Sequence, residues 1–172
     1  MFSLKSFSEN WFYSFYPDYC NSLTSEEKEW ITKLNRLGMG NFQALVTALI
    51  NSKFNVEDKI RCLKAIERFI FMAFRMAKYQ TSWLSNVAYT YARDLLKGTK
   101  SISEITEFFK KNTDENIEGM LSSFATNMQR YFNNYDGFYS WSDLKYVLFE
   151  YEAELAKGRN MPRISSWEYF TK

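Results

Sequence analysis

Apolar residues recur at three- and four-residue steps along one long segment, from Val56 to about Lys78. This is the period of an α-helix that buries one face, because 3.6 residues make one turn. The length of the segment and its near-continuous apolar face predict the central helix of a bundle, with the other helices packed around it. The apolar face consists of Ile66, Phe69, Ile70, Ala73, Phe74 and Ala77.

Capping signals divide the rest of the chain into shorter helices. Thr24 with Glu27, and Ser101 with Glu104, have the spacing of a capping box, in which a hydroxyl and a carboxylate each bind an orphan backbone N–H. Glycine just after a helical pattern is a typical stop. The expected helices, with approximate bounds, are 5–15, 25–37 ended by Gly38, 42–51 capped by Asn41, 56–78 capped by Asn55, 82–97 opened by Thr81 or Ser82 and ended by Gly98, 102–111, 114–127, and 142–157 ended by Gly158.

Breakers are sparse, and the alternation typical of β-strands is nowhere sustained. Proline occurs only at Pro17 and Pro162, and there are six glycines. A chain of 172 residues fits one domain with a sizeable core. The sequence therefore predicts an all-α fold: a single-domain irregular bundle of about seven to eight helices over residues 1–172.

The composition limits the chemistry that this chain can perform. It has no histidine, which excludes a Ser-His-Asp triad, a His-Asn-His nuclease centre and a histidine-ligated zinc site. The only cysteines, Cys20 and Cys62, match no metal spacing and are expected to be buried reduced thiols. With no signal-peptide pattern and no long apolar run, the expected compartment is the cytoplasm, without a membrane contact.

A stripe of basic residues accompanies the apolar face of the long helix. At about 100° per residue, the five cations fall within one band roughly 100° wide, where a phosphate backbone or an acidic neighbour could dock. The alternative is a solvated face whose Lys and Arg stems cover the edges of the core. The basic stripe comprises Arg61, Lys64, Arg68, Arg75 and Lys78.

Two runs of the chain are unusually aromatic. Aromatic side chains can stack on nucleic-acid bases, but neither run is interleaved with Lys or Arg as a single-strand binding surface would be. Core packing, or contact with a neighbouring domain, is therefore the favoured interpretation. The first run is Trp11, Phe12, Tyr13, Phe15, Tyr16 and Tyr19; the second is Tyr131, Phe132, Tyr135, Phe138, Tyr139 and Trp141.

Glu150 and Glu154 share one face of the last long helix, and paired carboxylates can bind Mg²⁺ or exchange protons. No third acidic ligand follows at a recognisable spacing, and Lys157 offers Glu154 a simple ion pair. No catalytic, cofactor-binding or metal-binding residue is therefore predicted, and no cofactor is expected.

Three segments together resemble a bacterial defence family. They are LNRLGMGNFQALVTALI (34–50), AIERFIFMAFR (65–75) and LKYVLFEYEAELAKGR (144–159). Their apolar and aromatic pattern and their order are similar to the helical middle region of GmrSD-type restriction endonucleases. In that family, a ParB/sulfiredoxin-like nucleotide-hydrolysing domain precedes the helical region, and a His-Asn-His nuclease domain follows it.

The catalytic motifs of that family do not occur in this chain. There is no Asp-Gly-Gln-Gln-Arg run, and the sequence stops at Lys172, about where a Glu-His-Ile-x-Pro motif would be approached. The resemblance therefore implies an excised middle piece of a larger protein, with no catalytic position to carry over.

We thus expect a non-catalytic helical domain that spaces and couples an NTP-hydrolysing domain and a nuclease domain in phage defence, with those neighbouring domains as its partners. Two alternatives remain open. In the first alternative, the chain is a nucleic-acid-binding module that uses the basic stripe. In the second, it is a stand-alone protein–protein adaptor. Self-association into a homo-oligomer is also expected if apolar surface is exposed.

Overall fold

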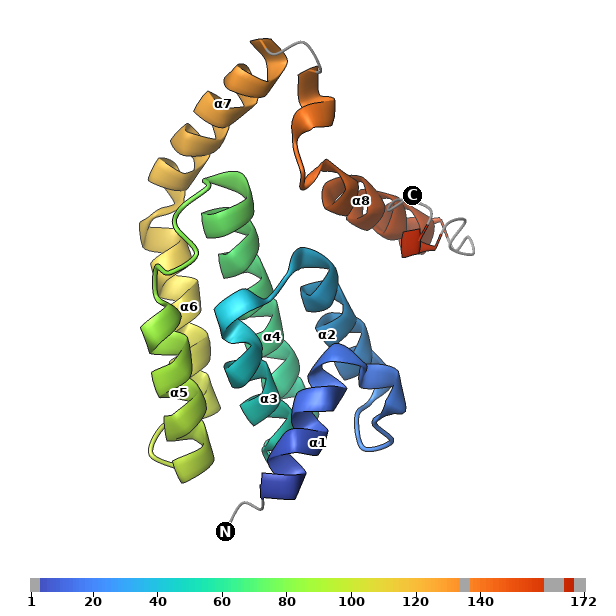
Figure 1. Ribbon diagram of the computed structural model, residues 1–172, viewed down its shortest axis with the longest axis vertical. Helices are drawn as coiled ribbons and strands as arrows, with labels where there is room; N and C mark the ends of the chain where they lie inside the picture. The colour runs from blue at the N-terminus through green and yellow to red at the C-terminus, as the bar shows by residue number, and fades with distance from the viewer. Residues whose placement is uncertain (1–3, 134–136, 160–165, 169–172) are drawn as a thin grey trace. The chain divides into compact units, whose positions relative to one another are not determined.

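The computed structural model describes residues 4–133, 137–159 and 166–168, and none of these residues forms a strand. The all-α prediction is confirmed (Figure 1). The elements are α1 (Leu4–Phe15), η1 (Pro17–Tyr19), α2 (Ser25–Leu37), η2 (Gly40–Phe42), α3 (Gln43–Asn51), α4 (Val56–Ile70), η3 (Phe71–Met76), α5 (Ser85–Lys97), α6 (Ile102–Glu115), α7 (Ile117–Asn133), η4 (Gly137–Ser140) and α8 (Leu144–Gly158). By its contacts the chain divides into two units, Met1–Phe124 and Ala125–Lys172.

The first unit consists of two layers of three helices. In one layer α4 packs between α2 and α6, and in the other α3 packs between α1 and α5. Figure 1 shows α3 lying over α4 and α5 lying over α6. The prediction that the segment beginning at Val56 is central is therefore correct, and α3 has the same central place in the second layer.

Phenylalanine rings fill the space between the layers. Phe42, at the end of η2, meets Phe69 of α4 at a centroid distance of 5.7 Å and Phe109 of α6 at 5.5 Å, and all three side chains are fully buried. Phe74 of η3 lies 5.6 Å from Phe69 and at right angles to it. Tilted and edge-to-face pairs of this kind stabilise beyond their buried area by about 0.5–1.5 kcal/mol each. The apolar face predicted on the long helix is buried throughout.

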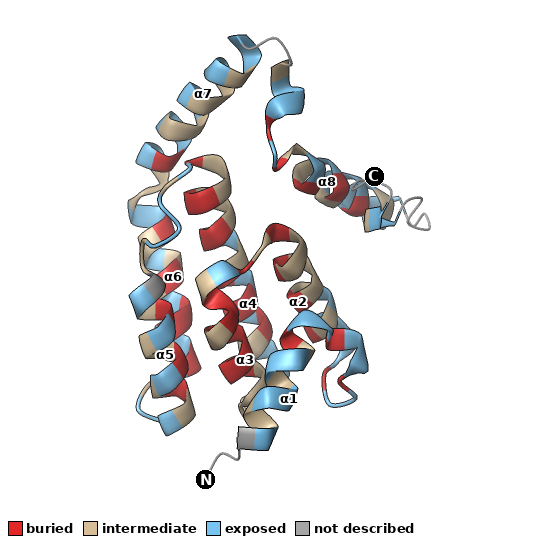
Figure 2. Cartoon of the chain, viewed as in Figure 1, coloured by how far each residue is buried: buried red, intermediate tan, exposed pale blue. Residues whose placement is uncertain are grey.

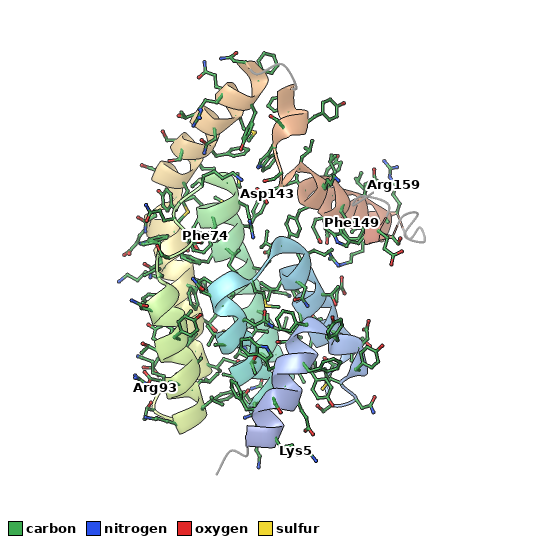
Figure 3. The ribbon with its side chains drawn as sticks, viewed as in Figure 1. Lys5, Phe74, Arg93, Asp143, Phe149 and Arg159 are labelled. Atoms are coloured by element: carbon green, nitrogen blue, oxygen red, sulfur yellow. The ribbon has the colours of Figure 1, made fainter. Side chains whose placement is uncertain are left out.

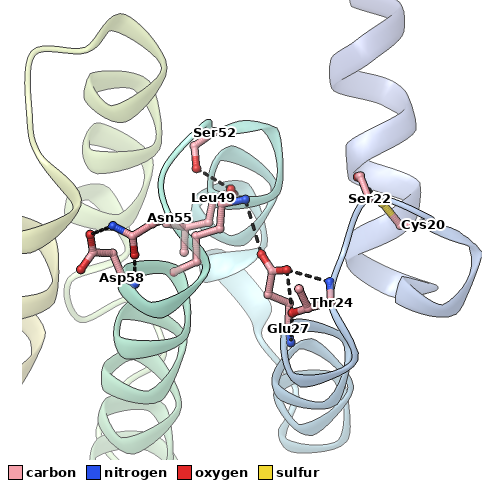
Figure 4. A network of polar contacts seen from close by, with 9 residues as sticks. Cys20, Ser22, Thr24, Glu27, Leu49, Ser52, Asn55 and Asp58 are labelled. Carbon is pink, nitrogen blue, oxygen red and sulfur yellow. Dashed lines mark hydrogen bonds and ion pairs between the residues drawn. The ribbon is translucent and has the colours of Figure 1, made fainter.

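Both capping boxes form as predicted. The Thr24 hydroxyl accepts from the backbone N–H of Glu27 at 3.2 Å, and the Glu27 carboxylate accepts from the backbone N–H of Thr24 at 2.8 Å (Figure 4). Ser101 and Glu104 repeat the arrangement at the start of α6. Glu27 is also buried, and its second oxygen lies 3.4 Å from Lys59 Nζ, so the cap of α2 is ion-paired with α4.

The long helix keeps its direction but changes its hydrogen bonding. The α-helix ends at Ile70 and continues as one π-helical turn, η3, in which the N–H of Ala77 bonds to the carbonyl of Met72. Lys78 then has a φ of 58° and ends the helix where the sequence predicted. One inserted residue in a helix widens a turn and re-aims the side chains after it, and no pattern in the sequence predicts this turn.

Two predicted helix starts are wrong. Asn41 does not cap α3, because the chain from Met39 is already helical and enters α3 through η2 without a side-chain cap. Neither Thr81 nor Ser82 opens α5, which begins at Ser85 after Leu84 in a left-handed conformation. In addition, α6 and α7 run further than expected, to Glu115 and Asn133.

The second unit contains the last part of α7, then η4 and α8. Phe132 and Phe138 are in ring contact at 5.6 Å, and Phe149 of α8 meets Trp167 edge-to-face at 5.3 Å. Figure 3 labels Phe149 on α8. The buried side chains of α8 are Tyr146, Phe149 and Ala153, at helical spacing.

Both cysteines are buried and unpaired with each other, as predicted. Cys62 lies on α4, and its burial raises the pKa of its thiol from 9.0 to about 12, although a hydrogen bond with Thr106 opposes the shift. A thiol whose pKa is higher in the folded state favours folding while it stays protonated. Its contribution is complete below pH 9 and is lost as the pH rises from 9 toward 12.

We therefore expect the free energy of unfolding to fall above pH 9 by up to about 1.4 kcal/mol per pH unit from this thiol alone. Urea unfolding of the reduced protein at pH 8, 9 and 10 measures the slope, and Cys62→Ala and Cys62→Ser remove the ionisable group. Both variants should lose stability less steeply with pH than the wild type. Equal slopes for all three proteins would contradict the prediction.

Candidate protein-interaction surface

The first three residues of the basic stripe are engaged in ion pairs. Arg61 lies 3.0 Å from the Asp58 carboxylate within α4. Lys64 lies 3.7 Å from Glu26 of α2, and Arg68 lies 2.9 Å from Asp114 of α6. Lys64 and Arg68 thus bridge the central helix to both of its layer neighbours, and the charges of these first three residues are matched by carboxylates.

Of the last two residues of the stripe, Arg75 lies in the π-helical turn and Lys78 follows it. Arg75 donates from Nη2 to the carbonyl of Gly38 at 3.1 Å, which ties η3 to the end of α2. A Cβ at Gly38 would lie 2.6 Å from this nitrogen, and the φ of Gly38 is 85°, so glycine is required there. Lys78 is exposed in the turn after η3. A cavity of about 290 Å³ beside Arg75 is lined by Gly38, Met39, Gly40, Asn41, Phe42, Phe74 and Thr81.

Helix α1 faces the bundle with polar side chains. Ser6, Asn10 and Ser14 are spaced by four residues and therefore share one face. The Ser6 hydroxyl and the Asn10 amide both donate to Asn51 Oδ1, at 3.1 and 2.7 Å. Ser14 is fully buried and accepts from the amide of Gln43. Hydrogen bonds thus join α1 to α3 along this face.

A further bond fixes the end of α1 on α2. The Asn35 amide donates to the carbonyls of Ser14 and Phe15, at 2.9 and 3.1 Å. These carbonyls belong to the last turn of α1, which has no partner within its own helix. The polar contacts therefore anchor α1 to both layers.

The outer face of α1 and η1 is aromatic. Five side chains on it are between 39% and 70% exposed. Figure 2 shows the contrast: α1 is mainly pale blue and tan, whereas α3 behind it is largely red. An amphipathic helix normally turns its apolar face inward, whereas in α1 only Phe7 and Tyr13 are half-buried and the other rings are exposed. This aromatic face comprises Trp11, Phe12, Phe15, Tyr16 and Tyr19.

The rings of the aromatic face touch one another. Phe12 lies 4.9 Å from Tyr16 and 5.8 Å from Tyr19, and Trp11 lies 6.0 Å from Phe15, between ring centroids. An aromatic cage for a cationic ligand needs rings that stand apart, because the ligand must fit between their faces. The contacts leave no such gap, so this is a continuous surface and not a small-molecule site.

The second aromatic run divides between the interior and the surface. Trp141 is buried, whereas Phe132, Phe138 and Tyr139 are exposed. Tyr135 lies outside the described residues.

Of the two acidic residues Glu150 and Glu154 on α8, Glu154 forms the simple ion pair with Lys157. Glu154 lies 3.5 Å from Lys157 Nζ, as expected. Within the described part of the chain, no three His, Cys, Asp or Glu side chains converge as metal ligands.

Comparison with protein-family models, curated proteins and solved structures finds no match. The resemblance to GmrSD-type proteins therefore stays a prediction. None of the described helices is both long and apolar enough to span a bilayer.

The sequence located the aromatic run but not its direction. The signal that could have predicted the orientation of α1 is the four-residue spacing of Ser6, Asn10 and Ser14, which defines a polar face among aromatic residues. In a surface helix that face would normally point to solvent, and only its hydrogen-bond partners on α3 show otherwise.

Duplex DNA should bind weakly, because phosphates would have to displace carboxylates from Arg61, Lys64 and Arg68. We expect no electrophoretic shift at about 150 mM salt with roughly 10 μM protein. Asp114→Asn frees the Arg68 guanidinium and should raise the affinity at low salt. A salt-sensitive shift by the wild type that Arg68→Glu and Arg75→Glu weaken would contradict this expectation and favour the nucleic-acid-binding alternative.

Asn51→Ala removes the acceptor that two α1 side chains share. We expect the free energy of unfolding to fall by about 1–2 kcal/mol, and the amides of α1 to exchange hydrogen faster. Asn41→Ala is the matched control, because its two side-chain hydrogen bonds are long, at 3.4 Å. Unchanged exchange in α1 of the Asn51→Ala protein would mean that polar contacts do not hold the helix.

Proposed function

We propose that this chain is a non-catalytic helical coupling module that acts by binding protein through the aromatic face of α1 and η1. The observation that carries the proposal is the orientation of α1, whose Ser6, Asn10 and Ser14 side chains face α3 while five rings of α1 and η1 are exposed. Contiguous exposed apolar surface is typical of protein-interaction sites.

The physical argument concerns the free energy of the rings. Burying apolar surface is favourable by about 25 cal/mol per Å², and folding of this unit leaves much of the aromatic face in water. Phe, Tyr and Trp are also the residue types enriched at the centres of protein interfaces. A partner that covers the face would gain the burial that folding does not supply.

Coupling further requires that the face be rigidly connected to the rest of the bundle. The hydrogen bonds of Ser14, Asn35 and Asn10 join α1 to both layers. A displacement of α1 by a partner would therefore act on α2 and α3 together. Discrete shifts of packed helices are a common means of transmitting such a change.

The sequence resemblance supplies identities for the domains that would be coupled. In a GmrSD-like restriction endonuclease, these are an NTP-hydrolysing domain and a nuclease domain of a phage-defence protein. The proposal that the chain is the helical part of such a protein rests on the three segments of similar sequence, whereas the proposed use of α1 rests on its orientation alone.

Site-specific photo-crosslinking in cells tests the proposed face. Benzoylphenylalanine replaces Phe12 or Tyr16 on the aromatic face, and Tyr89 on α5 is the control because it is similarly exposed, at 50%. We expect a defined protein adduct from positions 12 and 16, identified by mass spectrometry, and none from position 89. No adduct from the aromatic face, or the same adduct from position 89, would contradict the proposal.

A further inference from the structure

The aromatic face has no gap between the rings of its Phe12, Tyr16 and Tyr19 group. Its rings are in mutual contact, with centroids of Phe12, Tyr16 and Tyr19 separated by 4.9 to 6.4 Å. No side chain of a partner can enter between rings that already touch. A partner therefore packs against the exposed sides of these rings with apolar surface of its own.

We propose that this partner is a second copy of the chain, which docks its own aromatic face on the first about a two-fold axis. The proposal rests on the proposed function, since it names the occupant of the same face. An interface about a two-fold axis uses the same apolar patch on both copies, and the axis closes the assembly as a dimer. Homodimer interfaces are also more apolar than those of transient complexes.

The area of the face agrees with a dimer. An aromatic side chain can bury about 150–250 Å², so five rings that are between two-fifths and two-thirds exposed offer roughly 500 Å². Two copies would bury about 1,000 Å² from the rings alone, which is the lower bound for a specific interface. Obligate dimers bury about 2,000 Å² or more, so we expect an interface of this size to form a reversible dimer.

Charge at the borders of the face is balanced. Lys5 and Glu9 form an i, i+4 pair at 3.9 Å on α1, next to the rings. At the other border, Lys28 Nζ donates to the backbone carbonyl of Asp18 at 3.3 Å, and Asp18 brings one carboxylate to this border. A second copy would meet equal numbers of both signs, and a strongly charged partner would find no excess of the opposite sign.

Sedimentation velocity of the purified chain between about 1 and 200 μM tests the proposal in the relevant range of affinity. We expect a concentration-dependent shift from 20.5 kDa to twice that mass. Phe12→Glu should weaken the dimer at least about tenfold, because it removes a central ring and brings two like charges together. Tyr89→Glu is the matched control and should leave the dimer unchanged.

A second variant guards against misfolding. Tyr19→Glu is this variant, because Tyr19 lies beyond the end of α1. If Phe12→Glu reduces the helical circular dichroism signal, Tyr19→Glu replaces it, and we expect the same weakening of the dimer. A wild-type protein that stays monomeric at the highest concentration, or a dimer that both variants leave intact, would overturn the proposal.

The crosslinking experiment separates this failure from that of the proposed function. An adduct of twice the chain mass from position 12, together with a dimer in sedimentation, supports both proposals. An adduct with a different protein, together with a monomer in sedimentation, overturns the second copy and retains the interaction module. A monomer without any adduct overturns both.

Discussion

The hydrogen bonds beneath α1 determine what this molecule offers to its surroundings. Asn51 accepts from two α1 side chains, and Gln43 donates to Ser14 in the buried layer between α1 and α3. A polar group that is buried must keep its hydrogen bonds, because an unsatisfied one costs about 1–3 kcal/mol. Rotation of α1 about its axis would bury the rings but break these bonds, so the polar face fixes the aromatic face outward.

Pairing with partners inside the protein also explains why the basic stripe is not expected to attract phosphate. Cations on a helix attract phosphate only if they are not already neutralised. Lys64 and Arg68 instead meet carboxylates of α2 and α6, and Lys64 also lies 5.2 Å from the ring of Trp30. Exposed ion pairs contribute little to stability, about 0–1 kcal/mol each. Their effect here is to align α4 with its neighbours and to reduce the positive potential of the surface.

Local signals in the sequence predicted local structure well. The Thr24–Glu27 and Ser101–Glu104 boxes form because both of their hydrogen bonds lie within one turn, so no distant residue is needed to make them. Predictions failed where two neighbouring segments compete. Asn41 would cap an isolated helix, but the chain before it is already helical, so no orphan N–H is left for its side chain. The π-helical turn likewise depends on what packs around Phe71–Met76, which no local pattern encodes.

The sequence by itself determined the helical class, the long central segment, its buried face and the two buried thiols, because period, caps and glycine stops act over a few residues. Tertiary structure alone decided that five of the six rings of the first aromatic run are exposed and that the cations of α4 are paired. Both outcomes depend on partners distant along the chain: Asn51 lies 41 residues from Asn10, and Asp114 lies on a different helix from Arg68. The sequence of a helix determines its apolar and polar faces, but the residues that it packs against determine which face turns inward.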